Sequence, residues 1–287
     1  MAKNYCGLDF GTSNSTVGVL NNSQPQLLPL EGDNKTIPST IFFNSETATV
    51  HFGREAISEY IDGEFGRFMR SLKSVLGTPL MHEKTTVKNQ RISLIDVIGK
   101  FMEELKKRSE NHLGTKLDSV VLGRPVHFID HERNQDNDAQ KALHDAARKI
   151  GFKNIDFQYE PIAAALDYEQ QINKEETALI VDIGGGTSDF SIVRISPERR
   201  NAADRKEDIL ANEGVHVGGT DFDKWLSLQN VMPLLGYGAS YRDNPNLTTP
   251  ANYYHDLATW HMIHFLYAQQ TILAVKDLRS RIKESFL

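Results

Sequence analysis

Apolar residues along this 287-residue chain fall into short strand-like runs that alternate with longer helix-like stripes. Residues 92–111 carry apolar side chains at three- and four-residue spacing between charged ones, which predicts an amphipathic helix. A second such stripe, residues 131–150, ends before Gly151, a common helix stop. Residues 40–43 and 119–123 are apolar runs that predict buried strands. This alternation predicts a layered α/β fold.

Two later segments change this texture. The polar residues 170–176 predict a link between two lobes, with the second lobe opening at about residue 177. Residues 236–252 are rich in Gly, Asn, Pro and Tyr and predict an irregular loop, whereas the apolar spacing in residues 253–287 predicts helix.

One short phrase occurs twice in the chain. Each copy is an apolar strand, an aspartate, a glycine turn, hydroxyl residues and a second apolar run. The first copy contains Asp9, Gly11, Thr12, Ser13 and Asn14; the second contains Asp182, Gly184, Gly185, Gly186, Thr187 and Asp189. Internal similarity of this kind predicts two related lobes that face a shared ligand.

The repeated residues suit one chemical task. A carboxylate at a strand end can hold a hydrated cation, and glycine lets a turn adopt positive φ and bring its N–H groups close to an anion. Mg²⁺ keeps several waters and is usually held by one or two carboxylates together with phosphates. We therefore expect Asp9 and Asp182 to approach one magnesium ion from opposite sides. The alternative is a pair of ordinary hairpins, which the second copy makes the weaker interpretation.

At these residues the chain resembles the actin-like ATPase superfamily, and in particular its heat-shock-70 (DnaK-type) branch. Three further segments match that branch in the expected order: Glu160 to Ala165, Gly218 to Asp223, and, more loosely, Lys73 to Gly77. Details such as the segment from Gly123 to Val126 are most similar to the YegD-like bacterial members. The resemblance covers residues 1 to about 225.

The resemblance implies an α/β, actin-like ATPase (ribonuclease H-like) fold. Its two lobes would each hold a mixed sheet flanked by helices, with the second lobe incomplete. The implied division places residues 1–38 and 116–175 in the core of lobe I and residues 39–115 in its outer subdomain. Residues 176–224 would form the core of lobe II, and residues 225–287 part of its outer subdomain.

The resemblance also assigns roles, with ATP or ADP, Mg²⁺ and K⁺ as ligands. Asp9, Lys73, Glu160, Asp182 and Thr187 would be catalytic, with Asp9 and Asp182 holding Mg²⁺ through water and Asp189 contributing to a monovalent-cation site. The nucleotide would contact Gly11, Thr12, Ser13, Asn14, Gly184, Gly185, Gly186, Thr187, Gly218 and Gly219. A site of carboxylates, one lysine and backbone donors is sufficient for phosphoryl transfer, which depends on positioning and charge.

The local sequence supports the assigned role of Glu160 better than that of Lys73. Pro161 suits the first position of a helix, so Glu160 is expected to cap that helix at the positive end of its dipole. The alternative is an ordinary buried helix. Lys73 ends a basic segment, residues 67–73, for which a solvated basic face is nearly as good an interpretation.

Charge and composition exclude several classes of function. The formal net charge is −6 and no long basic run occurs, which argues against nucleic acid and acidic membranes as partners. The single cysteine, Cys6, forms no disulfide within the chain and is expected to be a small buried residue. No signal-peptide pattern and no run of 18 or more apolar residues is present, so we expect a cytoplasmic protein.

One departure from the family limits the expected activity. The adenosine pocket in this superfamily uses elements beyond the Gly218 turn, and those patterns are not visible here. The chain is thus expected to be a truncated ATPase domain that binds ATP weakly or does not turn it over, and that exposes apolar edges. Unfolded-protein clients and co-chaperones would apply only to a full-length protein. The alternatives are a small-molecule kinase of the same superfamily and a non-enzymatic actin-like scaffold or degenerate remnant.

Overall fold

The computed structural model describes residues 5–21, 24–87, 90–129, 133–202, 204–215, 217–242, 244–259, 262 and 272–277. The chain divides into two compact units. Unit 1 comprises Met1–Gly184 and Ser188–Val215, and unit 2 comprises Gly185–Thr187 and His216–Leu287. The four-part division into lobes and subdomains stays a prediction.

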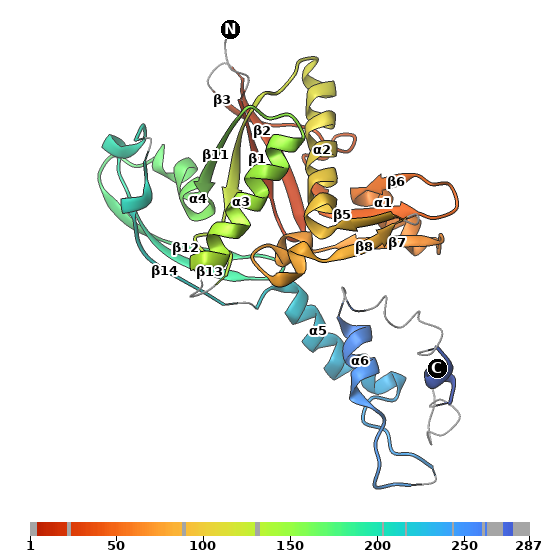
Figure 1. The fold of residues 1–287 in the computed structure, drawn as a ribbon. Helices are drawn as coiled ribbons and strands as arrows, with labels where there is room; N and C mark the ends of the chain where they lie inside the picture. Colours follow the sequence, from red (N-terminus) through yellow and green to blue (C-terminus); the bar gives the residue numbers. More distant parts are fainter. Residues whose placement is uncertain are drawn as a thin grey trace. The chain divides into compact units, whose positions relative to one another are not determined.

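The largest sheet of unit 1 has six strands (Figure 1). They are β1 (Tyr5–Phe10), β2 (Asn14–Asn21), β3 (Gln24–Leu27), β4 (Thr36–Pro38), β10 (Ser119–Arg124) and β11 (Asn154–Tyr159). Their order is β11-β10-β1-β2-β3, with β4 also pairing with β2. Strands β1, β10 and β11 run parallel, whereas β1 and β2 form an antiparallel hairpin. The sheet is therefore mixed, and its parallel part follows from the helices that connect those strands.

Helices α2 (Leu94–Leu113) and α3 (Arg133–Lys149) pack against one face of this sheet. Alternate residues of β1, namely Cys6, Leu8 and Phe10, are buried under them, as strand periodicity requires. Both helices confirm the sequence-based prediction within two residues wherever the chain is described. Helix α2 begins after Ser93, whose Oγ accepts a hydrogen bond from the Asp96 N–H at 3.2 Å.

A smaller part of unit 1 lies between β4 and α2. It contains α1 (Gly53–Ile61), β5 (Thr40–Asn44), β6 (Val50–Phe52), β7 (Gly66–Arg70), β8 (Lys84–Val87) and β9 (Gln90–Ser93). Strands β6-β5-β7 form one sheet and β8-β9 a ribbon. Two 3-10 turns, η1 (Leu72–Val75) and η2 (Pro79–His82), follow β7 and bring the chain back towards α2. The predicted strand at residues 40–43 is confirmed.

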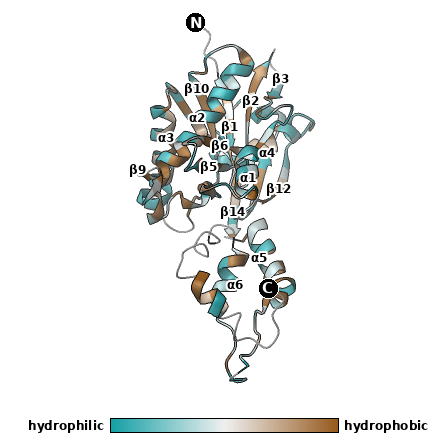
Figure 2. Ribbon diagram, turned by 90° about the vertical axis from the view of Figure 1, so that its right-hand side faces the viewer, coloured by the Kyte–Doolittle hydropathy of each residue, from teal (hydrophilic) through white to brown (hydrophobic). Residues whose placement is uncertain are grey.

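The third region of unit 1 is a three-stranded antiparallel sheet with helix α4 (Glu160–Glu169) packed on one face. Its strands are β12 (Glu176–Ile183), β13 (Ser188–Ile195) and β14 (Ile209–Val215), and η3 (Pro197–Arg199) and η4 (Lys206–Asp208) lie in the β13–β14 connection. The opposite face carries exposed apolar side chains, including Leu179, Val181 and Ile192. The hydropathy colouring of Figure 2 shows the alternation of apolar and polar residues along the strands.

Unit 2 is helical in its described part. It contains α5 (Gly219–Asn230), η5 (Met232–Leu235) and α6 (Ala251–Ala258). Leu228, Met232, Tyr254 and Ala258 form its small core. The helix predicted over 253–287 begins at Ala251 and stops at Ala258, residues 272–277 are helical, and the remainder lies outside the described residues. Over the described parts of both units, no helix is long and apolar enough to cross a membrane.

Candidate functional site

The two copies of the repeated phrase form matching hairpins in unit 1. In the first, Asp9 of β1 lies opposite Thr16 of β2. In the second, Asp182 of β12 lies opposite Asp189 of β13, and the two strands are joined through the glycine turn at residues 184–187. Each aspartate is therefore near the end of a strand that leads into a glycine turn. This local arrangement agrees with the sequence-based interpretation of both motifs.

Close approach, and not positive φ, explains the glycine at the first turn. A Cβ built on Gly11 would lie 2.2 Å from the backbone oxygen of Asn14, so no other residue fits without a shift of the chain. The freedom of glycine to adopt positive φ is not used here, because none of the site glycines is among the described glycines with positive φ. The glycines concerned are Gly11, Gly184, Gly185, Gly186, Gly218 and Gly219. Thr12, Ser13 and Asn14 follow Gly11 in the same turn and at the start of β2.

Lys73 lies in the 3-10 turn η1 and reaches the start of α4. Its Nζ is 2.7 Å from Oε1 of Glu160, and both side chains are largely shielded, with 13% and 21% exposure. The turn itself begins at Ser71, which has a φ of 54° in the left-handed region. Lys73 therefore does not sit on an open, solvated basic face, which was the alternative interpretation of this segment.

Glu160 is the first residue of α4 and not its cap. Tyr159 occupies the N-cap position without a side-chain hydrogen bond, and Pro161 is the second helical residue. The expected capping role of Glu160 is therefore wrong, because its carboxylate turns to Lys73. Gly123 lies beside this carboxylate: a Cβ there would be in ordinary van der Waals contact, 3.6 Å from Glu160 Oε1 and 3.8 Å from the Asp9 Cα.

Asp9 lies in a field of neighbouring charges. The Asp9 residue as a whole is accessible to water. Its carboxyl group is nevertheless partly buried, and this burial raises the pKa of Asp9. The charge of Lys73 opposes the rise in pKa, whereas the charges of Glu160 and Asp182 add to it. Asp9 and Asp182 are thus close enough for their charges to interact. Three carboxyl groups and one lysine leave an excess of negative charge here, and a bound cation would offset it.

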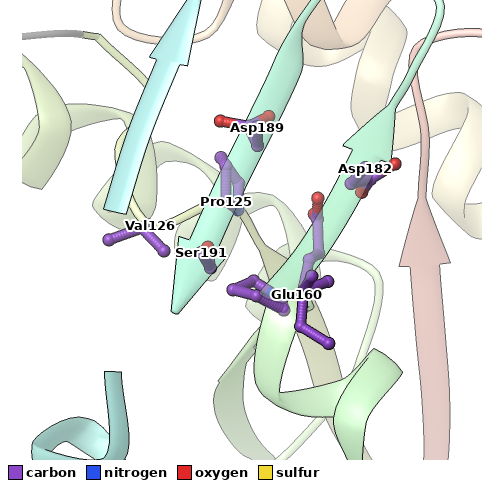
Figure 3. Close-up of a pocket in the computed structure, with 8 residues that line it drawn as sticks. Pro125, Val126, Glu160, Asp182, Asp189 and Ser191 are labelled. Atoms are coloured by element: carbon purple, nitrogen blue, oxygen red, sulfur yellow. The ribbon is translucent and has the colours of Figure 1, made fainter. Parts of the chain in front are cut away.

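A small pocket of unit 1 opens between α4 and the β12–β13 hairpin (Figure 3). Its lining is formed by Pro125, Val126, Glu160, Pro161, Ile180, Asp182, Asp189 and Ser191. In Figure 3, Asp182 lies on β12, Asp189 and Ser191 lie on β13, and the Glu160 side chain rises from the start of α4. Three carboxylates from separate elements therefore line one pocket.

Two glycines beside these carboxylates escaped the sequence analysis. Gly123 lies beside Glu160, and Gly214 of β14 lies directly opposite Asp189. A Cβ on Gly214 would approach Asp189 Oδ1 to 2.7 Å, so a side chain there would displace the carboxylate. Neither glycine belongs to the repeated phrase, and only strand pairing reveals which carboxylate each one adjoins.

In unit 2, the glycine turn joins the start of α5. The backbone oxygen of Gly185 accepts hydrogen bonds from the N–H of Thr220 at 2.8 Å and from its Oγ1 at 2.7 Å. Gly218 is the N-cap of α5, and its N–H donates to the Asp221 carboxylate at 3.0 Å. Gly185 of the glycine turn is thereby held beside Thr220 at the start of α5, and Asp221 has a capping function.

No protein-only metal cage is apparent in the parts of the chain that the structure describes. A search of these residues finds no group of three or more His, Cys, Asp or Glu side chains that could hold an ion directly. Magnesium held through water needs fewer protein ligands, usually one or two carboxylates. The chemistry of Asp9 and Asp182, with their mutual charge interaction, fits that type of site.

The mixed six-stranded sheet, the flanking helices and the paired Asp-Gly hairpins define an α/β protein with the actin-like ATPase fold, which confirms the predicted fold class. The second hairpin lies in a sheet that is antiparallel and not mixed over its described strands. The family model described as "Hsp70 protein" matches residues 5–231. Proteins named "Chaperone protein DnaK" from Ureaplasma urealyticum and Ureaplasma parvum are each 31% identical over 226 residues. The alignment covers 77% of this chain and 34% of each relative. The chain belongs to the Hsp70 family and spans about a third of the length of these curated relatives.

Proposed function

We propose that this chain is an Hsp70-type ATPase module that binds Mg²⁺ with ATP or ADP. One observation carries the proposal: the charges of Lys73, Glu160 and Asp182 all act on the Asp9 carboxyl. These four residues come from four separate elements of the fold. Family membership makes a small-molecule kinase or an actin-like scaffold the weaker alternatives. In this family the site would serve the reaction of ATP with water to give ADP and phosphate.

Each residue has a proposed part in that reaction. Asp9 and Asp182 would hold Mg²⁺ through water and would polarise the attacking water, which Glu160 would help to position. Lys73 offsets charge on the transferring phosphoryl group. Thr12, Ser13, Asn14 and Thr187, with the backbone N–H groups of Gly11, Gly184, Gly185 and Gly186, bind the phosphates, and Gly218 and Gly219 approach the ribose side. Asp189 contributes to a K⁺ site beside Asp182. Magnesium supplies charge neutralisation when it is bound.

The affinity for nucleotide is proposed to be low. The residues that we assign contact phosphates and metal, whereas no assigned group recognises adenine. Contacts with the phosphates alone would bind any nucleoside triphosphate and would not select one base over another. Client proteins, co-chaperones and a cytoplasmic location are proposals that rest on the longer relatives, and we propose no nucleic acid or membrane partner.

Isothermal titration calorimetry with Mg-ATP tests this function. We expect binding weaker than micromolar that disappears with EDTA and in Asp9→Asn. Asp156→Asn, an exposed carboxylate of β11, is the matched control and should bind as the unchanged protein does. Micromolar affinity would contradict the proposed low affinity, and no heat at millimolar nucleotide would contradict the function itself. A coupled ADP assay across candidate metabolites separates a kinase from an ATPase.

A further inference from the structure

A buried group of charged residues lies at the C-terminal end of α4, at the opposite end of the helix from Glu160. Glu169 and Asp208 have no exposed surface, and Arg205 is 4% exposed. The two terminal nitrogens of Arg205 donate to the Glu169 carboxylate at 3.0 and 2.8 Å, and its Nε pairs with Asp208. A bidentate pair of this kind fixes the relative orientation of both side chains.

The same region also holds the backbone at the end of the helix. Glu169 Oε1 accepts the Ser196 N–H at 2.9 Å. Arg200 donates from Nε to the carbonyl oxygen of Glu169 at 2.9 Å and from a terminal nitrogen to that of Ile172 at 2.6 Å. The last carbonyls of a helix lack partners within the helix, and a cation there also suits the helix dipole. The β13–β14 connection is therefore tied directly to the end of α4. We call Glu169, Ser196, Arg200, Arg205 and Asp208 the arginine clamp.

The clamp has a specific hydrogen-bond geometry, and its arginines favour the charged form of Asp208. Burial opposes the charge on Asp208, but hydrogen bonds from Arg199 and Arg205 outweigh it and hold the pKa of Asp208 below its usual range. Arg194 also faces Asp208, at 3.4 Å. A buried ion cluster contributes little net stability compared with apolar packing. We therefore interpret these buried charges as groups that orient the end of α4 and not as a source of stability.

Helix α4 connects the clamp with the candidate site. It is ten residues long, which corresponds to about 15 Å. On one side of α4, Ile162 and Ala165 pack against Val193 and Ile195 of β13. Charged groups contact the helix at each of its two ends. The N-terminal end carries Glu160, paired with Lys73. Since a short helix moves as one body, the attachment at one end constrains the side chain at the other.

We propose that Glu169 and Arg205 are positioning residues for Glu160, because the arginine clamp fixes the far end of α4 and thereby sets the Lys73–Glu160 contact. This inference rests on the proposed function for its effect on turnover. It concerns residues of the β13–β14 connection that touch no proposed ligand.

The test compares Glu169→Gln and Arg200→Ala with the control Glu207→Gln, an exposed residue of the same connection. Hydrogen exchange at the Ser196 amide reports whether the clamp has loosened. The reactivity of the Lys73 amine towards an acylating reagent, followed by peptide mass spectrometry, reports the distant contact. In both clamp variants we expect Lys73 to be more exposed and to be acylated several-fold faster than in the unchanged protein, with Glu207→Gln unaffected.

Turnover provides the second measurement. Where the unchanged protein hydrolyses ATP, we expect kcat to fall about tenfold in the clamp variants while KM stays within about twofold, as for a positioning defect. A loosened clamp with unchanged Lys73 reactivity would overturn the proposal. If Glu169→Gln does not fold, Arg200→Ala decides, because it leaves the buried ion pair intact. Failure of the unchanged protein to bind Mg-ATP would defeat the proposed function alone, since the Lys73 measurement needs no nucleotide.

Discussion

Lys73 and Glu160 are 87 positions apart in the sequence, yet Nζ of the lysine lies 2.7 Å from Oε1 of the glutamate. The contact joins the turn after β7 to the start of α4. Both charges also act on Asp9, and Asp182 adds a further negative charge to the same carboxyl. The lysine is thus a counter-charge for two carboxylates, Glu160 and Asp9, and not only the partner of one.

Removal of this counter-charge should destabilise unit 1. Lys73→Met leaves the shielded Glu160 carboxylate without its cation, and we expect a loss of about 1–2 kcal/mol in the free energy of unfolding. Urea denaturation at neutral pH measures it, and added Mg²⁺ should restore part of the loss. Lys149→Met is the control, because its pair with Asp96 is open to water, with 74% and 41% exposure. Equal losses in the two variants would contradict the special role of Lys73.

Asp9→Asn should make the protein more stable at neutral pH while abolishing magnesium-dependent binding. The folded protein raises the pKa of Asp9 above its ordinary value of 3.8, so the native state holds this proton more tightly than the unfolded chain does. Stability is therefore lost as pH rises through the raised pKa, and the ionised group opposes folding at pH 7. Thermal unfolding across pH should show a stabilised variant at pH 7 whose advantage shrinks below pH 3.8. A less stable variant at pH 7, with Asp156→Asn unchanged, would contradict this.

Glu110 should make the opposite contribution to acid stability. Burial opposes its charge, but hydrogen bonds from Lys106, Lys116 and the Leu117 N–H lower the pKa of Glu110 from 4.5 to about 2. Its contribution is complete above pH 4.5 and is lost as pH falls towards about 2. We expect Glu110→Gln to lose about 3 kcal/mol at pH 7, and less as the medium is acidified. Denaturant titrations at several pH values measure this, with exposed Glu103→Gln on the same helix as the control.

Two glycines of the first hairpin should respond differently to alanine. Gly11→Ala places a Cβ 2.2 Å from the Asn14 backbone oxygen, whereas a Cβ on Gly7 meets nothing within 4 Å. We expect Gly11→Ala to cost about 1–3 kcal/mol and to weaken nucleotide binding. Gly7→Ala should be neutral or stabilising, because glycine within a strand is itself unfavourable. Similar unfolding curves for the two variants would show that the turn tolerates a side chain.

The open face of the β12–β13–β14 sheet should bind apolar probes. Leu179 and Ile192 are register partners on this face, with 64% and 40% exposure, so the exposed apolar surface found here is a sheet face, whereas the sequence predicted exposed sheet edges. Leu179→Lys should lower the fluorescence of a bound apolar dye and reduce self-association, at a cost below about 0.5 kcal/mol in stability. Ile180→Lys, on the face that packs against α4, should cost several times more. Equal costs would mean that both faces are covered in solution.

Strand and helix locations, the two hairpins and the fold class could be predicted because they depend on local patterns. The alternation in β1 buries Cys6 and Leu8, and the apolar stripe of α2 meets the same core. The Asp-Gly hairpins needed only their own residues and a recognisable repeat. Prediction was less accurate at Glu160, where the local Glu-Pro signal indicated a cap and the structure instead directs the carboxylate to Lys73.

The sequence by itself determined which segments become strands and helices, since each such preference is set by residues within one turn or one hairpin. Only the tertiary structure decided which charges meet. The contacts of Lys73 with Glu160 and of Arg205 with Glu169 join segments 87 and 36 positions apart. Such contacts depend on strand order and on where each helix is attached, and no local spacing of residues encodes either.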